Sequence, residues 1–250
     1  MTPLEGVLVA TAGVVAGGMN AVVGSGTLVT FPVLLAIGYP PVVANVSNGL
    51  GLVPGSVSGA VGYRRELAGQ RGRLLRLGAV TALGAVGGAM VLLVLPPDAF
   101  ELIVPWLILL ALVLVLIQPW LARRLADRTD RHEHGGPVLL LGVLGVGVYG
   151  GYFGASQGVL NLALMGIMLD EDLQRLNAAK NVLTATANLV AGLVFVFVAD
   201  VAWLVVVLLA AGSMVGGHLG ATFGRRLRPL WLRVLIVTVG VVAMVQILVS

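Results

Sequence analysis

The sequence predicts an all-α integral membrane protein with about ten hydrophobic segments, arranged as two inverted five-segment repeats that each contain a short broken helix. Of the 250 residues, 58% are hydrophobic and only 10% are charged, whereas about a quarter of a soluble domain is charged. The mean hydropathy is +1.04, and apolar runs recur along the whole chain, which a single signal peptide would not produce. The 35 glycines suit helices in lipid, where small residues let backbones pack closely.

Ten apolar runs are bounded by proline, glycine and charge clusters. They cover residues 6–22, 25–38, 42–63, 77–95, 100–117, 137–153, 156–169, 177–198, 201–222 and 229–249. The second and the seventh run would form helices of about 21 Å, which is shorter than the roughly 30 Å hydrocarbon core. We therefore expect these two runs to cross the membrane as parts of broken helices.

Nearly all basic residues lie in three loops, residues 64–76, 123–131 and 225–233. The net charge of +4 and the pI near 10.1 would also suit a nucleic-acid partner, but arginines in short loops between apolar runs are typical of topology signals. The positive-inside rule places all three loops in the cytoplasm. An even number of crossings must then separate the loops, which requires that the short seventh run crosses. We predict ten crossings of the cytoplasmic (inner) membrane, with both termini outside.

An internal repeat relates residues 17–48 to residues 150–181. Matching residues at an offset of 133 are Gly17, Gly18, Asn48 and Gly59 with Gly150, Gly151, Asn181 and Gly192, whereas Gly26 and Leu28 match Gly158 and Leu160 at 132. We interpret residues 1–118 and 137–250 as two transmembrane repeats joined by a basic cytoplasmic linker, residues 119–136. Five crossings are an odd number, so the second repeat is inverted. Inverted repeats with broken, glycine-rich helices are typical of transporters with a site near mid-membrane.

The repeated motifs carry a family resemblance. GGMNAVVGSGTLVTFPVLL followed by GYPPVVANVSN, and the second copy ending in LNAAKNVLTATANLVAG, resemble the sulfite exporter TauE/SafE family of membrane permeases. The resemblance extends over essentially the whole chain. It implies a permease that moves sulfur-containing anions such as sulfite, sulfoacetate and related sulfonates, generally outward. The first motif has GSG at residues 24–26, where the family commonly has a richer glycine run.

Lys180 is the only lysine of the chain, and it lies inside the second copy of the motif at the start of an apolar run. A charge in a membrane segment must be paired, hydrated or functional, because its burial is costly. The acidic residues nearest to apolar runs, at 170–172 and 200, flank those runs. We interpret Lys180 as the residue that binds a small anion. The alternative is that Lys180 extends to the interface or is neutralised by the loop at 170–172.

Polar residues form a stripe around Lys180 and a matching set in the first repeat. The stripe has the spacing i, i+3, i+4, i+7 and i+11, which is one face of a helix: Asn177, Lys180, Asn181, Thr184 and Asn188. The matching set lies at the start of its own segment, where free backbone N–H groups and the helix dipole favour an anion: Asn45, Ser47 and Asn48. We predict that both sets line one cavity across a pseudo-twofold axis. Alternatively, these side chains form hydrogen bonds between helices.

Further candidates lie in the two short segments. They are Asn20, Ser25 and Thr27 in the first repeat and Tyr152, Ser156 and Gln157 in the second. Glycines beside them allow a helix to open and to present backbone amides to a ligand. In the alternative interpretation the glycines serve only close helix packing, and the polar side chains satisfy the break.

The histidines do not point to a metal or a proton pathway. His218 is the only histidine in an apolar run, and without an acidic partner we favour packing or a helix–helix hydrogen bond over proton relay. His132 and His134 lack further ligands nearby in sequence, so we expect a solvated loop there. There are no cysteines, which excludes disulfides and thiolate metal sites. We predict no cofactor.

These observations favour a secondary transporter that exports a small organosulfur or sulfur oxyanion by alternating access, with the lipid bilayer as its surroundings. An anion channel lined by the glycine-rich short segments and a membrane assembly factor without transport are the alternatives. The chain has no HExxH motif, no carboxylate pair in an apolar run and no GxxxxGK[ST] loop, so neither an enzyme nor an ATP-driven pump is predicted. Glycine-rich helix faces would also allow a homodimer.

Overall fold

The computed structural model describes residues 1–126, 136–223 and 238, and within this part the chain is helical without strands. The helices are α1 (Pro3–Val22), α2 (Thr27–Ala36), α3 (Pro41–Gly62), α4 (Arg71–Val94), α5 (Pro97–Ala126), α6 (Gly136–Tyr152), α7 (Gln157–Met168), α8 (Leu173–Val198) and α9 (Trp203–Phe223). They correspond in order to the first nine predicted segments. The tenth, residues 229–249, lies outside the described residues apart from residue 238, and so do His132 and His134.

Five of these helices, α1, α4, α5, α8 and α9, are long and apolar enough to cross a membrane by length and composition. Helix α3 is also long, with 22 residues, but its polar residues lower its hydropathy. Helices α2 and α7 have only 10 and 12 residues, or about 15 Å and 18 Å. The two short helices therefore occur where the sequence predicts short segments, each directly after a longer helix.

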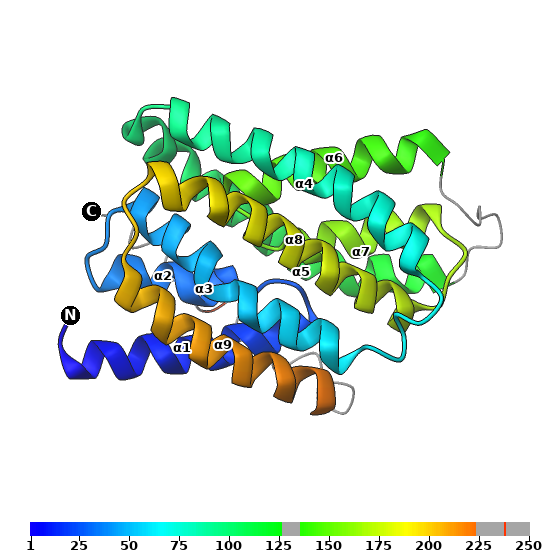
Figure 1. Ribbon diagram of the computed structural model, residues 1–250, viewed down its shortest axis with the longest axis horizontal. Coiled ribbons are helices and arrows are strands. Elements are labelled where there is room, and N and C mark those ends of the chain that lie inside the picture. The colour runs from blue at the N-terminus through cyan, green and yellow to red at the C-terminus, as the bar shows by residue number, and fades with distance from the viewer. Residues whose placement is uncertain (127–135, 224–237, 239–250) are drawn as a thin grey trace.

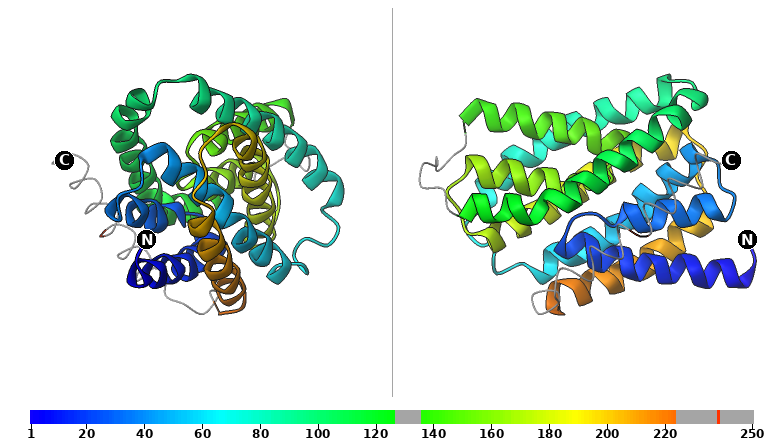
Figure 2. Two further views of the ribbon diagram at one scale, coloured as in Figure 1. Left: turned by 60° about the vertical axis from the view of Figure 1, so that its left-hand side comes forward. Right: turned by 180° about the vertical axis from the view of Figure 1, so that it is seen from behind.

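The helices run between two ends of an elongated bundle (Figures 1 and 2). The α3–α4 and α7–α8 connections and the start of α6 lie at one end, and α9 runs towards it. The N-terminus and the α2–α3, α4–α5 and α8–α9 connections lie at the other end. Residues 64–76, the first basic loop, thus share an end with the start of α6, which follows the second basic loop.

The same packing pairs occur in both halves of the chain. Helix α1 packs along α9, as α6 packs along α4, and α3 packs on α9, as α8 packs on α4. Helices α3 and α8 also contact each other between the two halves. If α1–α4 and α6–α9 exchange places, the α1–α9 contact becomes α6–α4, and the α3–α9 contact becomes α8–α4. The α3–α8 contact stays the same.

Glycines allow the α1–α9 and α6–α4 pairs to meet backbone to backbone. A Cβ atom on Gly17 would overlap the carbonyl oxygen of Ser213, and one on Gly151 would overlap that of Ala85. Helices without a hydrophobic driving force between them pack through such small residues. In these contacts Gly17 takes the place that Gly151 takes in the other helix pair, whereas the sequence match pairs Gly17 with Gly150. Contacts across a helix pair determine this register, and sequence identity alone does not reveal them.

Candidate functional site

Helices α1 and α6 end in the same way, so the two breaks have one geometry. Gly24 and Gly154 follow the helix ends with φ values of +88° and +75°. The N–H groups of Gly24 and of the residue before it donate to the carbonyl oxygen of Met19, at 3.0 and 2.7 Å, and the equivalent pair at Gly154 donates to Tyr149, at 3.0 and 2.9 Å. A glycine in this left-handed conformation is a common helix cap. It leaves other carbonyls of the last turn without partners inside the helix.

The two breaks touch each other. The backbone N–H of Gly158, in the first turn of α7, donates to the carbonyl oxygen of Gly24 at 3.2 Å. A Cβ atom on either residue would lie 2.6 Å from the Cα atom of the other, and one on Gly158 would lie 3.1 Å from Cδ of Lys180. Because the space holds only hydrogen atoms, glycine is required at both positions. The contact brings Lys180 to the meeting point of the two halves.

Lys180 lies two turns into α8 with none of its surface exposed. Its ammonium donates to the carbonyl oxygens of Asn20 at 2.9 Å and Ala21 at 3.2 Å. These carbonyls end α1, where the helix dipole is negative and favours a cation. No carboxylate in the described residues forms an ion pair with Lys180. The alternative in which Lys180 extends to the interface or to the loop at 170–172 is therefore wrong, and the end of α1 stabilises the charge.

Asn177 and Asn181 join Lys180 at the same helix end. Each donates from Nδ2 to the carbonyl oxygen of Ala21 at 3.3 Å. Three donors of the predicted stripe thus converge on one carbonyl. Two further polar atoms of α8 are buried without a partner among the described residues. They are Oδ1 of Asn177 and the hydroxyl of Thr184, which lies about two turns after Asn177.

Asn45 is the counterpart of Asn177 in the first half. Its Nδ2 atom donates to the carbonyl oxygen of Tyr152, in the last turn of α6, at 2.9 Å. An asparagine near the start of α3 therefore caps the broken helix of the second half, while an asparagine near the start of α8 caps the broken helix of the first half. The exchange ties the two halves together at both breaks.

The other two candidates on α3 have structural partners. Asn48 accepts a hydrogen bond from the hydroxyl of Thr30 and donates to that of Thr27 at 3.2 Å, so it joins α3 to α2 within the first half. Ser47 accepts from the backbone N–H of Ala202 at 2.9 Å, in the α8–α9 connection. Ser47 faces away from Asn45 in this conformation, because a residue two positions later lies on the opposite side of a helix.

Two polar side chains of the first break differ in how they are satisfied. The side-chain amide of Asn20 donates to the hydroxyl of Ser56 on α3 at 2.9 Å, while its backbone carbonyl accepts from Lys180. The hydroxyl of Ser25 is buried without a partner in the described part of the chain. Asn20 therefore contributes to the site through its backbone, and the hydroxyl of Ser25 is available for a further hydrogen bond.

At the second break, Gln157 and Tyr152 have buried polar atoms without a partner in the described residues, whereas Ser156 faces away. Both amide atoms of Gln157 are buried without a partner in the described residues, and Gln157 packs directly on Gly150. The hydroxyl of Ser156 instead donates to the carbonyl oxygen of Ala111 on α5 at 3.2 Å. Ser156 thus joins α7 to α5 in this conformation. Tyr152 contributes its carbonyl oxygen, while its ring packs on Phe100.

One residue of each polar set, Asn45 and Asn188, lines a common small cavity in this conformation. A small cavity of about 20 Å³ lies between α3, α6 and α8, lined among others by Asn45, Gly150 and Asn188. This volume holds about one water molecule and no tetrahedral oxyanion. Lys180 does not line it. Because Lys180 has no exposed surface, an anion reaches it only when the helices around it separate.

Asn161 belongs to the same region although the sequence analysis did not single it out. It lies one turn after Gln157 on α7, and both of its amide atoms are buried without a partner among the described residues. The i, i+4 spacing from Gln157 was a signal that could have identified it. His218, by contrast, is exposed on α9, so its predicted packing inside the helix bundle is not found in the described residues.

Residues 9–247 match the protein family described as Sulfite exporter TauE/SafE. The chain belongs to this family. The match extends over both halves of the chain and over all of the residues around Lys180. It confirms the resemblance that the glycine-rich motifs indicate.

Curated relatives of this TauE/SafE protein are named as probable membrane transporters. YfcA of Escherichia coli (strain K12) is 30% identical over 215 residues, which are 85% of this chain and 76% of YfcA. A protein of Haemophilus influenzae is 30% identical over 213 residues, 84% of this chain and 81% of the relative. ORF9 of a Sinorhizobium species is 25% identical over 236 residues, 94% and 88% of the two chains. No solved structure matches the chain significantly. Together with the five apolar helices, these names identify a multi-pass membrane transporter.

Proposed function

We propose that this TauE/SafE protein is a secondary transporter that exports a small organosulfur or sulfur oxyanion, of the sulfonate or sulfite class, by alternating access. The observation that carries the proposal is the position of Lys180. The only lysine of the chain is fully buried where the two helix breaks meet. Its partners in the described part are backbone carbonyls. A cation buried in a membrane protein without an acidic partner favours an anionic ligand.

The carbonyls of α1 give Lys180 a partner when no anion is bound. An ammonium has three N–H donors, and two of them are directed to Asn20 and Ala21. When the helices separate, an oxyanion replaces these carbonyls as the acceptor for Lys180, Asn177 and Asn181. After release, the carbonyls take the ammonium back. The ammonium of Lys180 therefore always has hydrogen-bond acceptors in the membrane. This lowers the free energy needed for the empty protein to return to its starting conformation.

The equivalent contacts of the two halves support two inverted repeats, residues 1–118 and 137–250, joined by the linker at 119–136. The α1–α9 and α6–α4 pairs and the exchanged caps of Asn45 and Asn177 support this organisation. Transporters of this kind work by rocking one repeat against the other around a site near mid-membrane. In this proposal the caps at both breaks form and break as the site opens to each side.

The basic loops support an orientation of the bundle in the membrane. Residues 64–76 and the start of α6 lie at one end of the bundle (Figure 1), and the positive-inside rule makes that end cytoplasmic in the inner membrane. Lys180 lies about 10 Å from the start of α8, which begins at this end. The site is therefore closer to the cytoplasm, from which an exported anion must come.

A membrane assembly factor without transport is the second candidate, because the packing around Lys180 is close. The cavity nearest to the breaks holds only about 20 Å³. A closed centre also suits a transporter between its two open states, and the names of the relatives favour transport. Measurement of flux separates the two candidates.

The test uses purified protein in liposomes loaded with radiolabelled sulfoacetate. Lys180→Gln removes the charge but keeps an amide that can donate to the end of α1. We expect at least about a tenfold loss of efflux, since the lost interaction is charged.

Thr186→Val is the control on the same helix, because the hydroxyl of Thr186 bonds only to Val182 of α8. Wild-type efflux in Lys180→Gln would overturn the role of Lys180, and absence of efflux in the wild-type protein would favour the assembly factor. A channel would lack saturable exchange.

A further inference from the structure

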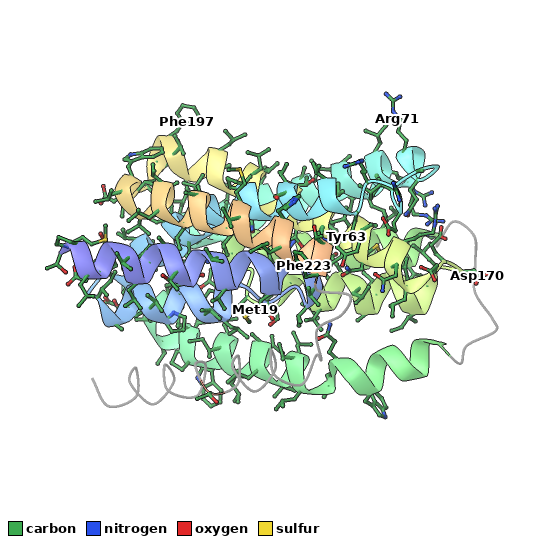
Figure 3. All side chains as sticks on the ribbon, turned by 90° about the horizontal axis from the view of Figure 1, so that it is seen from below. Met19, Tyr63, Arg71, Asp170, Phe197 and Phe223 are labelled. Carbon is green, nitrogen blue, oxygen red and sulfur yellow. The ribbon has the colours of Figure 1, made fainter. Side chains whose placement is uncertain are left out.

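A second charged site lies at the end of the bundle that holds the first basic loop. A cavity of about 410 Å³ lies where the α3–α4 connection meets the α7–α8 connection. Its charged lining consists of Arg73, Arg76, Arg175 and Glu171, and Gln70 and glycine backbone complete it. The volume is within the usual range of ligand pockets. Figure 3 shows Arg71 and Asp170, neighbours of this lining in sequence, at the same end of the molecule.

Glu171 holds two of these arginines in place. It accepts from Nη1 of Arg73 at 2.8 Å and from Nε of Arg175 at 2.7 Å. Arg175 is fixed further, because its Nη2 donates to the carbonyl oxygen of Ala68 at 3.1 Å and its own carbonyl oxygen accepts from Gln70 at 3.2 Å. The bond from the Arg175 guanidinium to Ala68 does not depend on Glu171, so it keeps this group ordered when a ligand displaces Glu171 and reduces the entropy that binding loses.

Three arginines and one glutamate leave the lining with an excess of positive charge. Planar guanidinium groups bind carboxylate, phosphate and similar oxyanions through paired N–H donors. The carboxylate of Glu171 accepts one N–H from each of two guanidinium groups, those of Arg73 and Arg175. A tetrahedral oxyanion would compete for the same donors, and the guanidinium of Arg76 lies in the same lining.

We propose that this pocket binds an oxyanion group, the sulfonate, sulfate or phosphate of a soluble anion or of a lipid headgroup, in competition with Glu171. Its position on the cytoplasmic side rests on the topology proposed above. Arg73 belongs to the first half and Glu171 to the second, so an oxyanion that displaces Glu171 from Arg73 removes an ion pair between the halves. The pocket thus captures an anion at the mouth of the proposed pathway and loosens the contact that closes it.

The experiment measures binding of radiolabelled sulfate to the full chain in phosphatidylcholine nanodiscs. All variants carry Lys180→Gln, so that binding near the helix breaks does not contribute. We expect Arg76→Gln to weaken sulfate binding at least about threefold and Glu171→Gln to strengthen it by a similar factor, as typical ion-pair energies predict. Arg71→Gln is the matched control, because this substitution removes the same charge nearby, but Arg71 does not line the cavity.

Nanodiscs with phosphatidylglycerol distinguish the two sources of the oxyanion. If lipid headgroups occupy the pocket, sulfate binding falls in these nanodiscs, and Arg76→Gln releases lipid that co-purifies with the protein. If the ligand is soluble, sulfate binds equally in both lipids.

The gain in affinity expected for Glu171→Gln cannot result from misfolding. Equal effects of Arg71→Gln and Arg76→Gln on sulfate and lipid binding, with no gain in Glu171→Gln, would overturn the proposal. The Lys180→Gln background keeps this result independent of the efflux test.

Discussion

The backbone N–H of Gly158 donates to the carbonyl oxygen of Gly24 at 3.2 Å, and this bond joins the helix breaks of the two halves. Each residue leaves the other no room for a side chain, since a Cβ on either would lie 2.6 Å from the opposite Cα. The aliphatic part of Lys180 packs on Gly158. The position of the ammonium at the end of α1 therefore depends on this glycine pair.

Gly158→Ala should separate the breaks, because the added methyl meets backbone that cannot move without shifting a helix. We expect a loss of about 1–3 kcal/mol in stability, as for other overpacked sites, and a lower efflux rate. The unfolding midpoint in detergent measures the first effect. Gly145→Ala is the control, because a Cβ on Gly145 in α6 meets nothing within 4 Å. A Gly158→Ala protein as stable as Gly145→Ala would show that the contact is not required.

Asn45→Ala and Asn177→Ala should each destabilise the protein by about 1 kcal/mol, the usual net value of a hydrogen bond. Each variant leaves a buried carbonyl at the end of α6 or α1 with one donor fewer. Asn177→Ala should also weaken anion binding, because Asn177 shares Ala21 with Lys180. Chemical denaturation and binding of labelled sulfoacetate measure the two effects. Sulfoacetate binding that is unchanged in Asn177→Ala would place the anion elsewhere.

Ser47→Ala should reduce stability without changing the affinity for the anion. The hydroxyl of Ser47 accepts from the backbone N–H of Ala202, away from the breaks. We expect a cost of about 1 kcal/mol and a dissociation constant for sulfoacetate close to that of the wild-type protein. The same binding assay measures both proteins. A large change in affinity would mean that Ser47 turns towards the site when the helices separate.

The ion pairs of Glu171 with Arg73 and Arg175 should weaken only when the pH falls below about 4.5. Burial raises the pKa of Glu171, but hydrogen bonds from Arg73, Arg175 and the backbone of Asp172, together with the charge of Arg175, lower it more, so the pKa lies below its ordinary value of 4.5. A carboxylate with a lowered folded-state pKa stabilises the protein above the unfolded-state pKa, and this stabilisation is lost as the pH falls through the folded-state value. The unfolding midpoint of the wild-type protein should therefore exceed that of Glu171→Gln by a constant amount from about pH 7 to pH 5.5, and the difference should shrink below pH 4.5. A difference that disappears near pH 6 would contradict this.

Much of the helical order follows from the sequence, because lipid requires every backbone group of a crossing segment to bond internally and so makes apolar runs a strong signal. The ends of the helices follow less well. Helix α4 begins at Arg71, whereas the apolar run begins at residue 77, since a helix continues into water where hydropathy no longer marks it. The burial of Lys180 was likewise predictable, because a lone charge in an apolar run indicates an interior position.

The partners of the polar residues were not predictable. Nothing in the sequence around Lys180 indicates that its ammonium bonds to the end of a helix about 160 residues earlier in the chain. The opposite directions of Asn45 and Ser47 follow from helical geometry, but the choice of the face towards α6 depends on the packing of α3 against α9 and α8. Such long-range contacts result from backbone shape at glycines, which sequence patterns record only loosely.

The most direct measurement uses the fact that Lys180 is the only lysine. Protein labelled with a nitrogen isotope in lysine gives a single Nζ signal in a magnetic resonance spectrum. Titration with sulfoacetate should shift this signal until it saturates, at the concentrations that saturate efflux, because the ammonium exchanges the carbonyls of Asn20 and Ala21 for the anion. An uncharged amide analogue of sulfoacetate should leave the signal in place. An Nζ signal that does not move while efflux saturates would show that Lys180 stays on the end of α1 and that the anion passes elsewhere.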